Sequence, residues 1–475
     1  MKKYKDTGCG ITKIETTNAT LCNRGGLAFI MKYVESIGFF KLVESSIIGI
    51  CSHGKGKNAS FLIRQILAFF IDGTYKAISS FDILQKDEGY AATLEVKKEN
   101  LISSHTVKRF FRKFTFSRCG MLRKVLNHLF IWRLQVERPE VVILDGDTMV
   151  LDNDDADKRE GVSPTCKQVK GFQNLQITSK GIVADAIFRR GSAHSNHGND
   201  LKQSVKRIVN LIRSRYRTDV PIILTTDSGF LDEKNLSYFA ETLGIYFVCF
   251  GKLYDSVREY VSGCSEDDFK RFENGKTRRE YVEFASRLKS WKQLGFIRTI
   301  FTKLVCDENG QMLPDFARPD SVLYTNIGMG SSDRTILEHA GGLSDGLDAA
   351  GITRLAHNRG CNELVNRSLK NFMTSEHLPF KNFGMNAAYY HLMVIGHLLL
   401  GSYRDDVLLE YVPSIGPACY PEKIRRRAID FAAGIVRTGG YVVLKITRAV
   451  NDALDAVKLW KRCTGEGIKP VPLLQ

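Results

Sequence analysis

Three acidic residues far apart in the chain stand where metal-binding carboxylates could be placed: Asp147, Asp227 and Glu363. Asp147 closes the apolar run 141–147, Asp227 closes a second run over 220–227, and Glu363 lies in a segment with a helical pattern. Two carboxylates at the ends of buried strands and one on a helix could converge on a pair of hard cations. Such a centre suits phosphodiester chemistry, in which metals activate the attacking oxygen and stabilise the leaving one.

The first of these positions has two candidates, because Asp145 and Asp147 alternate along an extended chain and therefore point the same way. Either could be the ligand, and we prefer Asp147. A strand end rich in aspartate is also typical of a simple turn, and taken alone this segment favours the turn. After Asp227, Gly229 would free the backbone beside a bound phosphate, which again is a weak signal alone.

The third acid comes with two cations at helical spacing. Arg359 lies four residues before Glu363 and Lys370 lies seven after it, so the three share one face of a helix. With Glu363 on a metal, Arg359 and Lys370 would contact the flanking phosphates. The simpler alternative is an exposed salt bridge between residues four apart, with a lysine further along the helix.

The charge of the chain points to a polyanionic partner. Lysine and arginine number 68 against 52 acidic residues, a net charge of +16. The cations recur along the whole length, in clusters over 109–124, 202–217, 276–279 and 423–427. Any one cluster could be solvated surface, but four together favour a long polyanion such as duplex DNA.

Two further segments are candidates for DNA contact. Ser103 is a good N-cap for a helix that carries Lys108, Arg109 and Arg112, and this helix resembles the second helix of a helix-turn-helix. A surface helix that only supports the core is an equal alternative. Trp291 lies between lysines and could stack on an unpaired base, although a core role fits as well.

Several classes of protein are excluded. The eleven cysteines are scattered and include no CxxC pair, which argues against a disulfide framework and a zinc ribbon and favours a reducing cytoplasmic compartment. No signal peptide is evident at the N-terminus. The longest apolar segment, 389–400, is too short and too polar to cross a bilayer, so we expect no membrane partner.

The order of predicted elements gives the fold class. Residues 136–240 read as three strands, a helix and a fourth strand, the order of an RNase H-like core. We expect an α/β protein with an RNase H-like mixed sheet flanked by helices. The patterns divide the chain into a helical DNA-binding region, the first part of the core, a β-rich insertion, the second part of the core and a basic C-terminal region, over 1–135, 136–244, 245–330, 331–420 and 421–475.

These residues together resemble the cut-and-paste DDE transposases of bacterial insertion sequences, in the branch with the spacing Y-(2)-R-(3)-E-(6)-K. Arg359, Glu363 and Lys370 match the last three positions. Ala356 stands at the tyrosine position, so that role is lost or is taken by His357. Segments over 147–162, 167–172 and 188–198 are similar to the family as well, and the resemblance covers roughly residues 20–450.

The resemblance implies an RNase H-like fold with a β-rich insertion between the second aspartate and the glutamate. It also implies two Mg²⁺ ions, which Mn²⁺ could replace, held by Asp147, Asp227 and Glu363. Water would cut the element end and release a 3′-OH, which would attack target DNA. Trp291 would hold a flipped base in any hairpin step.

The partners implied are the terminal inverted repeats of the element and the target duplex, bound by a homodimer beside the bacterial nucleoid. Two other functions stay open: a noncatalytic DNA-binding protein derived from a transposase, and a structure-selective nuclease that cuts but does not join strands.

Overall fold

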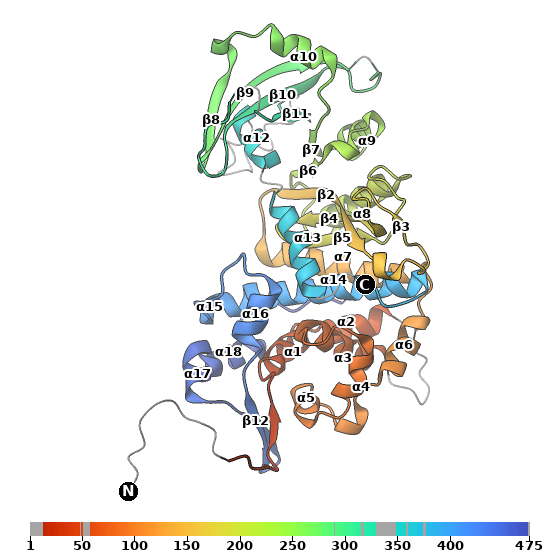
Figure 1. Cartoon of the computed structure of the whole chain (residues 1–475), viewed down its shortest axis with the longest axis vertical. Helices are drawn as coiled ribbons and strands as arrows, with labels where there is room; N and C mark the ends of the chain where they lie inside the picture. The colour runs from red at the N-terminus through yellow and green to blue at the C-terminus, as the bar shows by residue number, and fades with distance from the viewer. Residues whose placement is uncertain are drawn as a thin grey trace.

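A mixed β-sheet with helices on both faces runs through the centre of the chain (Figure 1). The computed structural model describes residues 13–47, 49–50, 58–288, 290–314, 318–328, 348–357, 360–373 and 377–473. Within them ten strands form one sheet in the order β3-β4-β2-β6-β7-β11-β10-β9-β8, with β5 paired to β4. The edge strand β3 is Ser163–Pro164. The mixed α/β class is therefore confirmed.

Five of these strands form the core that positions the acids: β2 (Val142–Asp152), β4 (Lys170–Ser179), β5 (Ile182–Ile187), β6 (Ile222–Thr226) and β7 (Tyr246–Phe250). β4 runs antiparallel to β2 and β5 antiparallel to β4, whereas β6 pairs parallel with β2 and β7 parallel with β6. Helix α8 (Asp200–Arg215) connects β5 to β6. The spatial order β5-β4-β2-β6-β7 is the RNase H-like arrangement expected from the sequence.

The two faces of this core bury different partners because side chains alternate along a strand. On one face Leu144 and Leu224 pack with apolar residues of α7 (Cys119–Glu137) and α8. The opposite face carries Asp145 and Asp147, and further along β2 it buries Met149 and Leu151 in a core shared with α13 (Gly360–Met373) and α14 (Phe383–Tyr403). The acids therefore lie on the face that α13 covers.

Beyond β7 the sheet continues with four more strands, which follow β7 in the chain. These are β8 (Lys270–Asn274), β9 (Thr277–Ser286), β10 (Ile297–Cys306) and β11 (Asp320–Thr325). β11 pairs antiparallel with β7, so the strands extend the core sheet at its edge. Helices α10 (Asp255–Ser262) and α12 (Ala349–His357) accompany them at the top of Figure 1. The division of the chain into five regions stays a prediction.

Helices form the region before β2, as predicted: α1 (Leu27–Ser36), α2 (Phe39–Ser46), α3 (Ala59–Asp72), α4 (Phe81–Leu84), α5 (Glu88–Thr93), α6 (Ser104–Arg112) and α7. α1 and α2 are separate helices because Gly38, between them, adopts φ +80° and changes the chain direction. Ser103 caps α6 as predicted, accepting a hydrogen bond from the Thr106 N–H at 3.3 Å.

The C-terminal region adds α16 (Pro421–Ala428), β12 (Ala433–Thr438), β13 (Tyr441–Lys445), α17 (Arg448–Leu454) and α18 (Ala456–Cys463). β12 pairs with β13 and with β1 (Thr20–Cys22) in a separate sheet of three strands. β12 has little apolar alternation, and its pairing with the distant β1 stabilises it.

A buried ion pair joins α7, β5 and α8 behind the core sheet. Asp185 is fully buried and accepts hydrogen bonds from Arg123 Nε at 2.6 Å, Asn127 Nδ2 at 3.0 Å and Ser204 Oγ at 2.5 Å. Burial opposes the charged form, but the Arg123 guanidinium and the hydroxyl and amide donors outweigh it and hold the pKa of Asp185 below its usual value. Arg123 is therefore a structural residue and does not belong to a DNA-binding cluster.

Replacing Arg123 by Ala should destabilise the fold by about 3–5 kcal/mol, because it leaves a buried carboxylate without its counter-charge. Urea unfolding followed by circular dichroism measures this loss. Arg109→Ala, at an exposed position of α6, is the matched control and should change stability by less than about 0.5 kcal/mol. A loss below about 1 kcal/mol for Arg123→Ala would show that the pair contributes little.

Candidate active site

Asp147 and Asp227 are brought together by the parallel pairing of β2 with β6. In that register Gly146 is the partner of Thr226, and the two aspartates are the next residues on their strands. Both are partly exposed, whereas the strand residues before them are buried. Asp227 follows the end of β6 as expected. Asp147 is not at a strand end, because β2 continues to Asp152 through its pairing with β4.

The structure separates the two candidates for the first acid. Asp145 is 3% exposed, and its Oδ1 accepts a hydrogen bond of 2.6 Å from Thr225 Oγ1 on β6. Asp147 lies two residues further, beyond the last paired residue of β6, and is partly exposed. A carboxylate at this position is accessible to an ion and to a substrate, and one inside the β2–β6 pair is not.

Helix α13 packs on β2, the strand that carries Asp147 (Figure 1). Asn366 Nδ2 donates a hydrogen bond of 3.1 Å to Asp147 Oδ2, and Val365 and Leu369 are buried in the core shared with β2. Glu363 lies in the first turn of the same helix, and its side chain is outside the described part of the structure. Arg359 also lies outside the described residues.

Asn366 is a site residue that the sequence analysis missed. Its signal was position alone: it follows Glu363 by three residues, and residues three apart lie on one side of a helix. An asparagine there carries no charge and belongs to no motif that we recognised. Lys370, four residues further along, is partly buried and lines a hollow beside α16.

His397 on α14 contacts α13. Ser368 Oγ and His397 Nε2 are 2.8 Å apart, and the His397 ring also meets Phe372 edge-on. Burial, with smaller contributions from Arg404 and Arg425, lowers the pKa of His397 to about 4. The imidazole is therefore neutral near pH 7.

The loop that follows β5 approaches the second acid. Asp227 Oδ1 accepts the Gly229 N–H at 2.9 Å, and a methyl group on Gly229 would lie 2.8 Å from Ser195 Oγ. Asn196 Oδ1 accepts a hydrogen bond of 3.2 Å from Asn235 Nδ2. The segment 194–198, a loop, thus lies beside Asp227. Gly229 is required here by this close approach.

The donor set at this position fits a hard divalent cation. Asp147 and Asp227 offer carboxylate oxygens, which Mg²⁺ and Mn²⁺ prefer, and Asp227 has no ion-pair partner among the described residues. The described side chains contain no cluster of three or more His, Cys, Asp or Glu residues arranged for a metal, and the Glu363 side chain is not among them. The two aspartates supply part of a ligand set that a third acid would complete.

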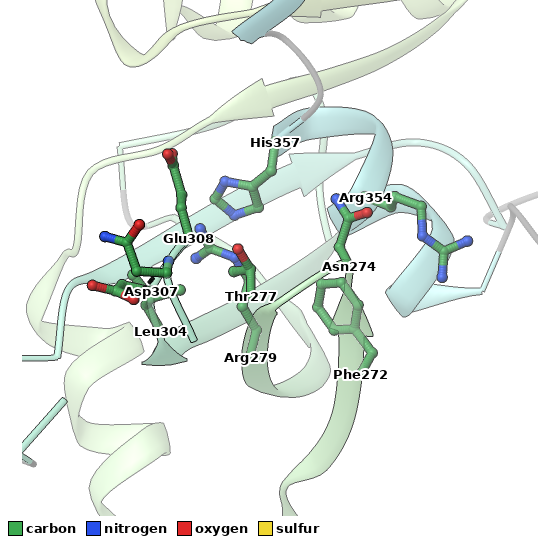
Figure 2. Close-up of a pocket in the computed structure, with 10 residues that line it drawn as sticks. Phe272, Asn274, Thr277, Arg279, Leu304, Asp307, Glu308, Arg354 and His357 are labelled. Carbon is green, nitrogen blue, oxygen red and sulfur yellow. Dashed lines mark hydrogen bonds between the residues drawn. The ribbon is translucent and has the colours of Figure 1, made fainter. Parts of the chain in front are cut away.

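His357, the candidate replacement for the tyrosine, lies at the end of α12 and lines a cavity of about 570 Å³ between α12 and the strands β8 to β10. Figure 2 shows its ring in this cavity, close to Arg279. Its Nε2 is buried and has no hydrogen-bond partner among the described residues. Burial and the Arg279 charge lower its pKa to about 4, so it is neutral near pH 7. The tyrosine position itself, Ala356, is buried.

The other predicted DNA contacts divide into exposed and buried residues. Lys108, Arg109 and Arg112 are exposed along one side of α6. Trp291 is 6% exposed and packs against Tyr324 with ring centroids 5.8 Å apart. In this conformation Trp291 has the core role given as its alternative, and a base would reach it only after the indole moved outward.

The family model described as "Transposase DDE domain group 1" matches residues 13–459. The chain belongs to this family of DDE transposases. The match spans both aspartates, α13 and the strands β8 to β11, and membership of this family supports a transposase function. DDE transposases use divalent metal ions, which agrees with the carboxylates at Asp147 and Asp227.

Similarity to curated and solved proteins is weaker. No curated protein matches the chain. Among solved structures, the cryo-EM structure of a piggyBac transposase synaptic complex with hairpin DNA is similar at a TM-score of 0.40 and 12% identity. The similarity covers 85% of this chain and 79% of that chain. A TM-score this low is too weak to carry residues or ligands from that complex to this transposase.

The helices give one finding about membranes. In the described parts of the chain, none of them combines the length and the apolar composition that crossing a bilayer requires.

Replacing Asn366 by Ala should raise the Mg²⁺ concentration for half-maximal DNA cleavage by about 10–100-fold, because side chains that orient a metal ligand contribute to affinity on that scale. A titration of cleavage against Mg²⁺ measures the shift. Asn210→Ala, on the exposed side of α8, is the control. An unchanged Mg²⁺ requirement would mean that Asn366 does not position Asp147.

Lowering the pH should destabilise the fold through His397, which contacts α13. Between pH 6.5, the ordinary pKa of histidine, and about 4, the unfolded chain binds a proton at His397 that the folded chain does not. The free energy of unfolding therefore falls as the pH falls through this window, by about 3 kcal/mol for this residue alone.

Unfolding by urea at several pH values, compared between the wild type and His397→Gln, tests this expectation. The variant should lose less stability between pH 6.5 and 4.5. His105→Gln, at an exposed position, should keep the wild-type slope. Equal slopes for the wild type and His397→Gln would contradict the assignment.

Proposed function

We propose that this transposase cuts DNA at the ends of its element and joins the released strand to target DNA, with Asp147, Asp227 and Glu363 as the metal ligands. These residues would hold two Mg²⁺ ions, or Mn²⁺ in their place. When bound, the ions would supply charge for the attacking and leaving oxygens of the phosphodiester.

The observation that carries the proposal is the packing of α13 on β2, with a hydrogen bond from α13 to Asp147. The parallel register sets Asp147 and Asp227 on neighbouring strands, and Asn366 joins α13 to Asp147. Glu363 precedes Asn366 by less than one helical turn on the same helix. This placement supports Glu363 as the third ligand and Asp147, instead of the buried Asp145, as the first.

The chemistry would proceed in two balanced steps. In the first, a water oxygen bonds to the scissile phosphorus, the bond from phosphorus to the 3′ oxygen breaks, and that oxygen leaves as a 3′-OH. In the second, this hydroxyl attacks a phosphodiester of the target, and the target's own 3′ oxygen leaves. The aspartates would orient both reactions, and Arg359 and Lys370 would contact flanking phosphates.

The finer assignments follow from the sequence resemblance. We propose a bacterial insertion-sequence origin in the Y-(2)-R-(3)-E-(6)-K branch, binding to terminal inverted repeats through Lys108, Arg109 and Arg112, and a homodimer in the DNA complex. The exposure of these three cations on α6 supports their role. The predicted bacterial cytoplasmic location, beside the nucleoid, belongs to the same proposal.

One observation favours a second candidate, a noncatalytic DNA-binding derivative. Ala356 occupies the tyrosine position and is buried, so no hydroxyl is available there. His357 is adjacent and has a buried nitrogen with no described partner. A catalytic chain needs His357 or another group to take over that role, and a noncatalytic chain does not.

The cleavage experiment separates these candidates. Wild-type protein with Mg²⁺ should nick DNA that carries the element end, and Asp227→Ala should lower the rate by at least about 10³-fold while DNA affinity stays within about twofold. Asp232→Ala, at the start of α9 (Glu233–Ser237), is the matched control.

Cleavage that survives in Asp227→Ala would refute the ligand assignment. A wild type that binds the DNA without cutting it would favour the noncatalytic protein. Cutting without any strand-joined product would favour the plain nuclease.

A further inference from the structure

Helices α13 and α16 form the walls of a groove that begins one turn beyond the Glu363 position, and the two helices are in contact (Figure 1). The groove holds a hollow of about 450 Å³ and continues into a second one of about 690 Å³ with which it shares Arg367, Asn371, Glu422 and Arg426. We call it the α13–α16 groove.

Its frame is rigid because Arg425 ties three elements together. Arg425 is 6% exposed, and its guanidinium donates to the carbonyls of Ile71 at 2.8 Å, Phe70 at 2.7 Å and Phe372 at 2.9 Å. These carbonyls lie near the ends of α3 and α13, where helices leave such groups without internal partners. Arg425 is thus part of the scaffold and not a free surface cation.

Glu422, which lines the groove, is hydrogen-bonded to α13. Glu422 Oε2 accepts a hydrogen bond of 3.3 Å from Asn371 Nδ2, and the Glu422 N–H donates to Asn371 Oδ1 at 3.0 Å. These contacts fix the first turn of α16 to the last turns of α13. Glu422 therefore has a structural role, and it is an exposed residue that lines the groove.

Four exposed cations remain on the walls: Arg367 from α13 and Lys423, Arg426 and Arg427 from α16. None of them takes part in an ion pair among the described residues. The Arg367 guanidinium lies over the Tyr420 ring, 5.6 Å from its centroid, which restrains its direction. Glu422 is the one carboxylate among the residues that line this hollow, so four cations face one anion and the hollow keeps a net positive charge. Such a charge attracts a polyanion.

The short distance between the groove and the acids indicates that the polyanion is the DNA substrate. Arg367 follows Asn366, the residue bonded to Asp147, and lies four residues from Glu363, about 6 Å along the helix axis. This is about the rise of two nucleotides of a DNA strand. Arg367 lies over one face of the Tyr420 ring, and the other side chains of the groove wall that could contact DNA are cations, which favours contact with phosphates over stacking on a base.

We propose that the α13–α16 groove binds the sugar–phosphate backbone of duplex DNA immediately beside the scissile phosphate, through Arg367, Lys423, Arg426 and Arg427. This rests on the proposed function. The contact is to phosphates, so it adds affinity and sets register without reading sequence.

The test is the triple variant Lys423→Gln, Arg426→Gln and Arg427→Gln, which keeps good helix formers on an exposed helix face. Binding to duplex DNA, measured by fluorescence anisotropy at several salt concentrations, should weaken by about tenfold or more at 0.1 M salt. The slope of log affinity against log salt should become shallower by about 2–3. Arg367→Gln alone should change the slope by about 1.

A matched control separates the groove from the net charge. The triple variant Lys41→Gln, Lys97→Gln and Lys461→Gln removes the same charge from three exposed positions on other elements. It should keep most of the affinity. Equal losses in both triple variants, or no loss in the groove variant while its melting temperature matches the wild type, would overturn the proposal.

Ethylation of single phosphates locates the contact. Ethyl groups next to the cleavage site should weaken binding of the wild type and have little effect on the groove variant; equal interference with both proteins would overturn the proposal. If wild-type protein fails to bind or cut DNA at all, the proposed function fails. If wild type cuts and the groove variant binds like it, only the groove assignment fails.

Discussion

The parallel pairing of β2 with β6 is the constraint on which the rest of the site depends. It places Thr225 beside Asp145 and Thr226 beside Gly146, so the next residues, Asp147 and Asp227, are neighbours. Because alternate residues of a strand face opposite sides, a shift of one residue would turn Asp147 toward α7 and α8 and into the apolar core. The apolar residues on that side, among them Leu144 and Leu224, determine the register and therefore the positions of the two acids.

Helix α13 is the second requirement, and it is held from several directions. Val365 and Leu369 bury one side in the core shared with β2, His397 meets Ser368 from α14, and Arg425 binds the carbonyls at its end. Asn366 then reaches Asp147. A helix fixed in this way can present a ligand near its start and cations further along, so one element would serve both the chemistry and the binding of DNA.

The sequence predicted the core of this fold well because its strands have strong local signals. The apolar runs ending at Leu144 and Thr226 and the turn at Lys180 and Gly181, both with positive φ, were sufficient to give the strand order. The pairing of β12 with β1, about 410 residues apart in the chain, was not predictable, because neither strand has an apolar pattern and each depends on the other.

The site was predictable in its charged residues and not in its neutral ones. Aspartates after apolar runs are visible in a sequence, and Asn366 is not, because its role exists only through its distance from Asp147. The sequence also did not show which cations point inward. Arg123 and Arg425 belong to basic clusters in the sequence, but in the structure they bind fixed partners inside the protein. Whether a cation faces solvent depends on tertiary packing, which clusters in a sequence do not report.

The most direct test of the central claim replaces Mg²⁺ with Fe²⁺ and adds ascorbate, so that hydroxyl radicals cut the protein backbone within reach of the bound ion. Mass spectrometry of the fragments then locates the ion without relying on DNA cleavage. The account predicts cuts near Asp147, near Asp227 and near the start of α13 together, all suppressed by excess Mg²⁺. Cuts at only one of the three places, or cuts that Asp227→Ala does not diminish, would contradict it.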